Sequence, residues 1–142
     1  MIRRFADEKT LRQFAAEFVK NLKAGDHVLL EGPLGVGKTT FVRGMLEALN
    51  YQGLVRSPTY NLLQAFDTSP PVLHADLYRL EGASGLGLED YLSTHIVCVE
   101  WPDRLKGLIE AEQAYTVRIS FSDPGRTIEI TEPLSNLPRA LG

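Results

Sequence analysis

Cysteine is nearly absent from this 142-residue sequence, which contains only Cys98. A single cysteine excludes a disulfide within the chain and any zinc site built from cysteines. Its place in an apolar run predicts a buried, unreactive thiol. No apolar run approaches the length of a bilayer, and Asp7 and Glu8 stand where a signal peptide would need its hydrophobic stretch. We therefore expect a cytoplasmic protein without membrane contact.

An excess of positive charge is also missing. The chain carries 15 Lys and Arg against 18 Asp and Glu, which gives a net charge of −3. This balance argues against broad, non-specific binding of nucleic acid, and no DNA partner is expected. It leaves room for a small basic patch, or for a partner that itself binds nucleic acid.

The composition is that of a soluble globular protein, with 44% hydrophobic and 23% charged residues. The sequence has neither internal repeats nor low-complexity tracts. At this length we expect one domain that spans residues 1–142. Residues from about 133 to 142 carry little pattern and are expected to fray.

The most informative pattern is Gly32-Pro33-Leu34-Gly35-Val36-Gly37-Lys38-Thr39, which fits the phosphate-binding P-loop G-x-x-x-x-G-K-[ST]. A short apolar run precedes it at 27–30, and apolar residues follow at helical spacing over 41–49. Glycines let backbone amides approach phosphate oxygens, and the helix N-terminus attracts the same anion. Lys38 can reach the β- and γ-phosphates, and the Thr39 hydroxyl can ligate Mg²⁺. The alternative is an ordinary glycine turn capped by a helix.

Apolar periodicity and breaker residues outline the remaining elements. An amphipathic helix is expected over 7–23, with Asp7 as N-cap and Gly25 as stop, and shorter helices over 88–92 and 101–109. Strands are expected over 60–66, 72–78, 96–99, 115–121 and 127–130. The first two and the last two of these read as hairpins, and 96–99 as a buried central parallel strand. The fold class is therefore α/β: a single P-loop NTPase domain with a mixed, mostly parallel sheet flanked by helices and carrying antiparallel hairpin strands.

Two acidic residues at strand ends are candidates to complete a hydrolytic site. Glu100 closes the apolar run 96–99, and Asp76 stands near the end of the strand expected over 72–78. Ligands of open α/β sheets bind beyond the carboxyl ends of the strands, where such acids can hold the magnesium shell or orient water. The alternative for each is a solvated carboxylate or a helix cap.

Several other polar and aromatic residues have two readings each. Thr59 is either a switch residue near the γ-phosphate or a turn hydroxyl, and Trp101 either lines the nucleotide pocket or belongs to the core. Arg79 either stabilises transferring phosphate or forms a surface salt bridge, which is the favoured reading. The histidines lack metal-ligand spacing and are interpreted as structural: His27, His74 and His95.

With these motifs in place, the chain resembles the bacterial TsaE (YjeE) family of small P-loop ATPases. Four blocks match in order: Gly32-Pro33-Leu34-Gly35-Val36-Gly37-Lys38-Thr39-Thr40-Phe41, Ser57-Pro58-Thr59-Tyr60, His74-Ala75-Asp76-Leu77-Tyr78-Arg79-Leu80 and Val99-Glu100-Trp101-Pro102. Many NTPases share the first block, whereas the other three at this spacing are far more specific. The helix that carries Thr10 also resembles the family's opening segment.

The resemblance implies a weak, Mg²⁺-dependent ATPase needed to form N6-threonylcarbamoyladenosine at position 37 of tRNAs reading ANN codons. It implies ATP and Mg²⁺ as cofactors, the TsaD–TsaB heterodimer as partner, and tRNA reached through that complex. The implied catalytic residues are Lys38, Asp76 and Glu100, and the implied metal-site residues are Thr39, Asp76 and Glu100. The implied nucleotide-binding residues are Thr10, Leu34, Gly35, Val36, Gly37, Lys38, Thr39, Thr40, Thr59 and Trp101.

Two other functions compete with the ATPase. A small-molecule or nucleotide kinase would need an acceptor pocket and usually a lid that carries arginine. A non-hydrolysing module would use bound nucleotide only to order a docking face. A GTPase is disfavoured because the sequence contains neither Asn-Lys-x-Asp nor Asp-x-x-Gly.

Overall fold

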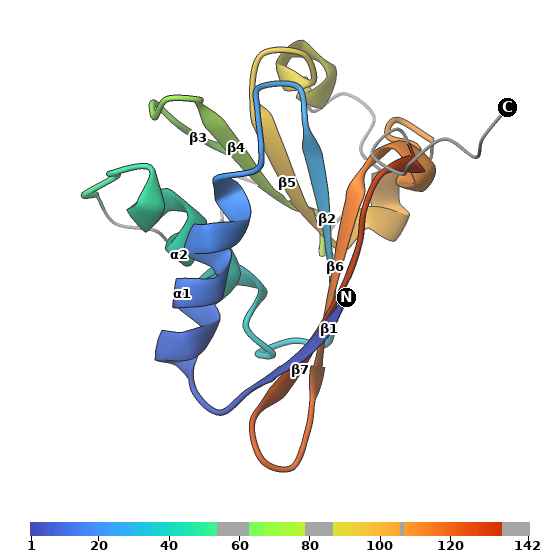
Figure 1. Cartoon of the computed structure of the whole chain (residues 1–142). Helices are drawn as coiled ribbons and strands as arrows, with labels where there is room; N and C mark the ends of the chain where they lie inside the picture. The colour runs from blue at the N-terminus through green and yellow to red at the C-terminus, as the bar shows by residue number, and fades with distance from the viewer. Residues whose placement is uncertain (54–62, 79–86, 106, 135–142) are drawn as a thin grey trace, which may run out of the picture.

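The computed structural model describes residues 1–53, 63–78, 87–105 and 107–134. Within them, one sheet contains seven strands in the order β1-β7-β6-β2-β5-β4-β3 (Figure 1). The strands are β1 (Ile2–Phe5), β2 (His27–Glu31), β3 (Leu63–Phe66), β4 (Val72–Asp76), β5 (Ile96–Glu100), β6 (Tyr115–Phe121) and β7 (Arg126–Thr131). The central strands β6, β2, β5 and β4 pair in parallel, and the outer pairings are antiparallel. The α/β class and the mixed, mostly parallel sheet are thus confirmed.

The two α-helices of the described residues, α1 (Glu8–Val19) and α2 (Lys38–Ala48), pack against each other on one face of the sheet (Figure 1). Their apolar stripes, which include Phe18, Phe41 and Met45, meet the buried residues of that face. Cys98 belongs to the same core, and burial raises the pKa of its thiol to about 12, which agrees with the expected unreactive cysteine.

The opposite face of the sheet is covered by short 3₁₀ segments: η1 (Leu88–Tyr91), η2 (Pro102–Leu105) and η3 (Ala111–Gln113). Apolar residues within η1 and η2 or beside η3 join a second cluster made of Leu29, Leu73, Ala75, Leu77, Leu88, Val97, Val99, Leu105, Ile109 and Ala114. Strands β2, β4 and β5 therefore carry apolar residues on both faces, as expected for central parallel strands.

Three predicted boundaries are wrong. Helix α1 starts after its predicted N-cap Asp7 but ends at Val19, because the next amides bond three residues back in tight turns. The helix expected over 101–109 shrinks to η2, since positive φ angles of 61° at Trp101 and 86° at Gly107 break it on both sides. Strand β4 ends at Asp76, two residues early, where the Asp76 carboxylate accepts the amide of Tyr78.

Strand β1 was missed because its sequence, Ile2-Arg3-Arg4-Phe5, does not alternate; it forms by pairing with the distant β7. The hairpin β6–β7 is confirmed, as is the antiparallel pairing of β3 with β4. Residues 60–62 of the predicted strand and most of the tail expected to fray lie outside the described residues.

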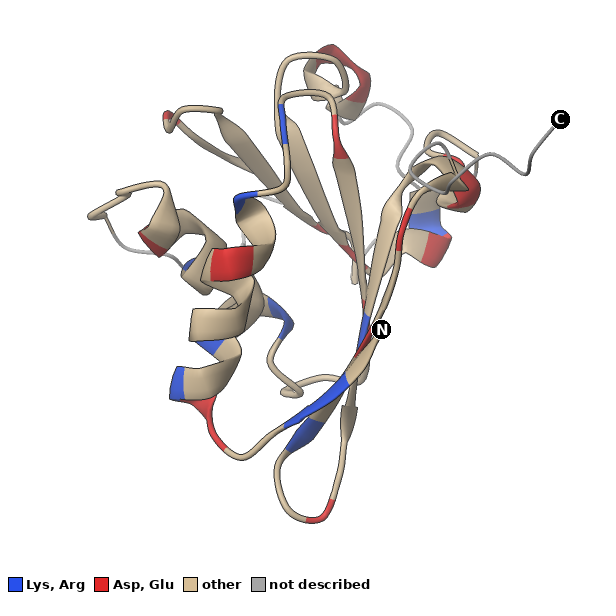
Figure 2. Ribbon diagram, viewed as in Figure 1, with Lys and Arg blue, Asp and Glu red and all other residues tan. Residues whose placement is uncertain are grey.

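Charges of both signs are interspersed along α1, whereas basic segments lie together where β1 runs beside the start of β7 (Figure 2). The arginines there are Arg3, Arg4 and Arg126, since Arg4 and Phe5 are register partners of Thr127 and Arg126. Among the described residues, no helix has both the length and the apolar character needed to cross a membrane.

Candidate nucleotide-binding site

The P-loop connects the end of β2 to the start of α2, so the strand delivers it to the carboxyl edge of the parallel sheet. Gly32 has a φ of 149°, and a Cβ there would collide with the carbonyl oxygen of Ile119. Gly37 is the N-cap of α2 with a φ of 124°, and a Cβ there would lie 2.8 Å from Leu11. Both positions therefore require glycine. The turn that they form directs the N-terminus of α2 toward the loop.

Lys38 is buried within this loop, with only 4% of its surface exposed. Its Nζ donates a 2.6 Å hydrogen bond to the carbonyl of Gly32 and lies 3.9 Å from the ring centroid of Trp101. Desolvation by burial lowers the pKa of Lys38, while the nearby charges of Glu100 and Asp76 oppose that shift. The Lys38 ammonium thus contacts a neutral carbonyl and the face of an aromatic ring, and an anion that enters the loop can bind to it.

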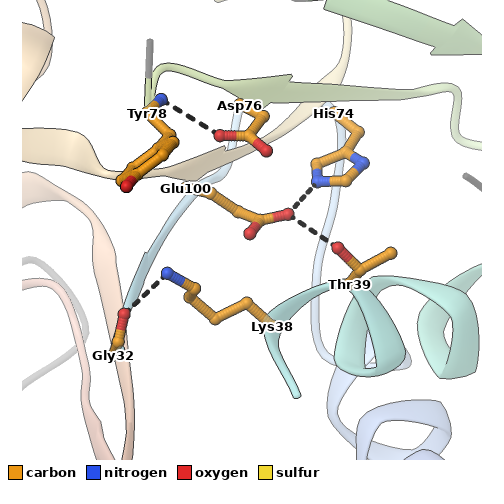
Figure 3. Close-up of polar contacts among 7 residues, drawn as sticks. All are labelled: Gly32, Lys38, Thr39, His74, Asp76, Tyr78 and Glu100. Carbon is orange, nitrogen blue, oxygen red and sulfur yellow. Dashed lines mark hydrogen bonds and ion pairs between the residues drawn. The ribbon is translucent and has the colours of Figure 1, made fainter. Parts of the chain in front are cut away.

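Glu100 is the buried end of β5, with 4% of its surface exposed. Its Oε2 accepts a 3.1 Å hydrogen bond from the Thr39 hydroxyl and lies 2.6 Å from Nε2 of the fully buried His74 (Figure 3). Asp76 ends the neighbouring strand β4 as the register partner of Glu100. The structure therefore brings Lys38 and Thr39 together with both predicted acids.

The oxygen donors of this group fit a magnesium ion. Mg²⁺ prefers hard oxygen ligands and is usually held by one or two carboxylates together with substrate phosphates. Thr39 and Glu100 already touch, and Asp76 stands on the adjacent strand. Across the described part of the chain, no cluster of three or more His, Cys, Asp or Glu forms a metal cage.

Trp101 lines a cavity of about 420 Å³ beside Lys38. It is half-buried, with its ring centroid 4.9 Å from that of Tyr78 at an interplanar angle of 45°. Its positive φ is rare for a bulky residue and turns the chain directly after Glu100. Trp101 also packs against the second core cluster, so its contact with nucleotide stays a prediction. The cavity is lined by Leu30, Glu31, Gly32, Pro33, Lys38, Trp101, Pro102 and Asp103.

A second cavity, of about 210 Å³, lies between the P-loop, the start of α1 and the β6–β7 hairpin. Arg126 reaches it from β7 and donates a 2.9 Å hydrogen bond from Nε to the carbonyl of Val36. Thr40 lines the same cavity, as do Gly35 and Gly37. Sequence reasoning missed Arg126, because nothing near it in the chain connects it with a P-loop 90 residues away.

Thr10 lies on the first turn of α1, where its hydroxyl donates to Asp7 within the N-cap. It lines a separate groove between α1 and β1, whereas its neighbours Asp7 and Leu11 line the second cavity. Its assignment to the adenine stays a prediction. Leu34 is 60% exposed at the tip of the loop, and Val36 is buried. Thr59 and Arg79 lie outside the described residues.

The three histidines differ in their surroundings. His27 Nε2 lies 2.8 Å from the carbonyl of Leu92, and His95 Nδ1 lies 2.8 Å from the Thr94 hydroxyl, both away from the P-loop. His74 instead touches Glu100, a contact that the sequence reading did not anticipate. Its spacing of two from Asp76 was the available signal, because residues i and i+2 of a strand share a face.

Comparison with known proteins agrees with this geometry. The sequence model of the family described as "Threonylcarbamoyl adenosine biosynthesis protein TsaE" matches residues 5–128. The chain belongs to the TsaE family. The TsaE protein of Haemophilus influenzae is 36% identical over 134 residues, which cover 87% of this chain and 84% of that protein. The TsaE protein of Bacillus subtilis is 36% identical over 128 residues, covering 88% and 79%.

Similarity to TsaE relatives extends to structure. The crystal structure of Bacillus subtilis YdiB superposes with a TM-score of 0.80 at 29% identity, covering 93% of this chain and 84% of that one. The TsaE resemblance drawn from four short motifs is thereby confirmed over most of the chain.

Proposed function

We propose that this TsaE-family protein binds ATP with Mg²⁺ at the P-loop and hydrolyses it slowly. We further propose that it serves the formation of N6-threonylcarbamoyladenosine at position 37 of tRNAs reading ANN codons, together with the TsaD–TsaB heterodimer. Its curated relatives carry the name "tRNA threonylcarbamoyladenosine biosynthesis protein TsaE". The observation that supports hydrolysis most directly is the contact between Thr39 and the buried Glu100, beside Lys38.

Different residues of the loop make different contacts with the bound nucleotide. Backbone amides around Gly35 and Gly37 face the phosphates, and the N-terminus of α2 adds its partial positive charge. Lys38 exchanges its hydrogen bond to Gly32 for phosphate oxygens, so binding neutralises a desolvated cation. Thr39, Glu100 and Asp76 are the residues that would hold Mg²⁺, which would supply charge neutralisation at the phosphates.

The acids act at the strand ends. A buried carboxylate such as Glu100 can orient the attacking water or hold a water of the metal shell. Asp76, one strand away, supplies a second negative charge on the same edge. Neither role needs a direct contact between a carboxylate and the phosphates, so the loss of either acid should reduce turnover more than metal-free nucleotide affinity.

Calorimetric titration with ADP and ATP, with and without Mg²⁺, tests binding, and phosphate release tests hydrolysis. Lys38→Ala should abolish binding, and Glu100→Gln should abolish most hydrolysis while binding persists. Glu129→Gln removes an exposed charge from β7 and is the matched control. Absence of Mg²⁺-dependent nucleotide binding in the unsubstituted protein would refute the proposal.

The partner is tested separately. Added TsaD–TsaB heterodimer from the same source should raise the hydrolysis rate and co-purify with the protein in ATP. Binding and slow hydrolysis with no response to the heterodimer would leave an ATPase with another partner. A phosphorylated acceptor in a small-molecule screen would instead favour a kinase.

A further inference from the structure

His74 lies in the interior of the protein, in contact with the carboxylate of Glu100. It lies on β4, two residues before Asp76, and its side chain is fully buried. Its Nε2 is 2.6 Å from Glu100 Oε2, whereas its Nδ1 is buried without a hydrogen-bond partner within the described part of the chain. A buried imidazole with a single polar contact, directed at a site carboxylate, requires an explanation.

The position of the ring proton follows from these contacts. A bare nitrogen 2.6 Å from a carboxylate oxygen would be repelled, so Nε2 carries the proton and donates it to Glu100. Nδ1 faces no acceptor among the described residues, which favours its bare form. His74 is therefore a one-sided donor to Glu100.

This contact fixes the orientation of the Glu100 carboxylate. Oε2 receives both His74 and the Thr39 hydroxyl, while Oε1 points away from His74 (Figure 3). A Thr39 hydroxyl that ligates a metal ion through an oxygen lone pair can still donate its proton to Oε2, so the hydrogen bonds from His74 and Thr39 together restrain the rotation of the carboxylate. We propose that His74 is a positioning residue that holds Glu100 with Oε1 directed to the magnesium shell and the attacking water. This inference rests on the proposed ATPase function.

Two amide substitutions separate positioning from mere packing. The amide nitrogen of glutamine in His74→Gln reaches the position of Nε2, whereas that of asparagine in His74→Asn stops near Nδ1. Both place a neutral amide in the same buried space, so a purely structural role would penalise both. Only His74→Gln restores the donor to Glu100. His74→Phe keeps the ring and removes the donor, which gives a second test if His74→Asn does not fold.

The first readout, called the Mg²⁺ ratio, is the ADP dissociation constant in EDTA divided by that in Mg²⁺, both measured by calorimetry. The second readout is kcat together with KM for ATP. Loss of a hydrogen-bonding partner of a metal-site ligand costs about 10–100-fold in metal affinity or activity. We expect His74→Asn and His74→Phe to lower the Mg²⁺ ratio and kcat by at least about tenfold. The dissociation constant in EDTA should stay unchanged, and His74→Gln should behave nearly as the unsubstituted protein.

The outcomes distinguish the inference from the proposed function. If the unsubstituted protein binds ADP with Mg²⁺ and folded His74→Phe keeps the full ratio and kcat, positioning by His74 is refuted and the ATPase stands. Equal losses in His74→Gln and His74→Asn would also refute it, as a packing effect. If the unsubstituted protein shows no Mg²⁺-dependent binding, the proposed function and this inference fall together.

Discussion

Asp76 and Glu100 are register partners on the parallel strands β4 and β5, and each is the last residue of its strand. Their charges both act on Lys38, whose pKa they raise against the effect of burial. The pair therefore forms one acidic edge facing one buried cation.

We expect Asp76→Asn and Glu100→Gln each to lower kcat by about a hundredfold, a typical contribution of a positioned acid or base. The nucleotide dissociation constant in EDTA should change by less than about tenfold, because phosphate contacts come from the loop. The double variant should lose less than the product of the single losses, since neighbouring groups that act together are not additive. Phosphate release under saturating ATP measures this, and an unchanged rate in either variant would remove that acid from the mechanism.

The buried Lys38 makes stability depend on pH in a defined direction. Its pKa is lowered from 10.5 in the folded protein, so the folded state binds this proton less tightly than the unfolded chain does. Stability associated with Lys38 is therefore complete above pH 10.5 and falls as the pH drops through the interval down to the lowered value. Below the lowered pKa the full cost of burying the charge is present.

Lys38→Met removes this cost while filling similar space. The nucleotide-free variant should be more stable than the parent at neutral pH, and the difference should shrink as the pH approaches about 10. Urea denaturation at several pH values measures it, with Lys20→Met at the exposed end of α1 as control. A parent more stable than Lys38→Met at neutral pH would mean that the bond to Gly32 and the Trp101 contact outweigh desolvation.

The parts of the site that sequence predicts are those encoded within a few residues. The P-loop, with its preceding strand and following helix, is local, and Glu100 directly follows its apolar run. The hairpins were predictable for the same reason, because alternation and turn residues stand next to each other. Local patterns thus identified both the central sheet and the main chemical groups.

Parts set by distant contacts were not predictable. Strand β1 exists because Ile2–Phe5 pair with residues 126–129 of β7, and its own sequence has no strand pattern. His74 reads as an ordinary core residue until β4 and β5 pair and bring Glu100 to it. The helix expected after Trp101 fails because the turn at the site imposes a positive φ, which overrides the favourable Pro102.

Arg126 supports the P-loop from outside, through its hydrogen bond to the carbonyl of Val36. Its guanidinium also lies 4.5 Å from the ring centroid of Phe121, a cation–π contact. We expect Arg126→Ala to raise the ATP dissociation constant by about 10- to 100-fold, because one lost charge-assisted hydrogen bond costs about 1.5–3 kcal/mol and the loop must then be ordered by the ligand. The effect on kcat at saturation should be smaller.

Arg118→Ala is the matched control for this prediction. Arg118 stands on the neighbouring strand β6, is exposed, and pairs with Glu31 at 3.0 Å. An exposed ion pair contributes about 0–1 kcal/mol, so this variant should bind ATP nearly as the parent does. Equal loss of affinity in both variants would point to a general effect of positive charge rather than to support of the loop.

Gly44 lets α2 approach α1 closely on the helical face of the sheet. A Cβ at this position would lie 2.5 Å from the carbonyl oxygen of Arg12 and 2.9 Å from Cβ of Ala15. Alanine normally stabilises a helix interior relative to glycine by about 1 kcal/mol, but overpacking costs about 1–3 kcal/mol. Because the clash includes backbone atoms that cannot rotate away, we expect Gly44→Ala to lower the free energy of unfolding by about 1–2 kcal/mol.

Adding Ala15→Gly should recover only part of that loss, since the contact with Arg12 remains. Urea denaturation of both variants measures the effect, and a Gly44→Ala protein as stable as the parent would show that α1 can move away from α2 without cost.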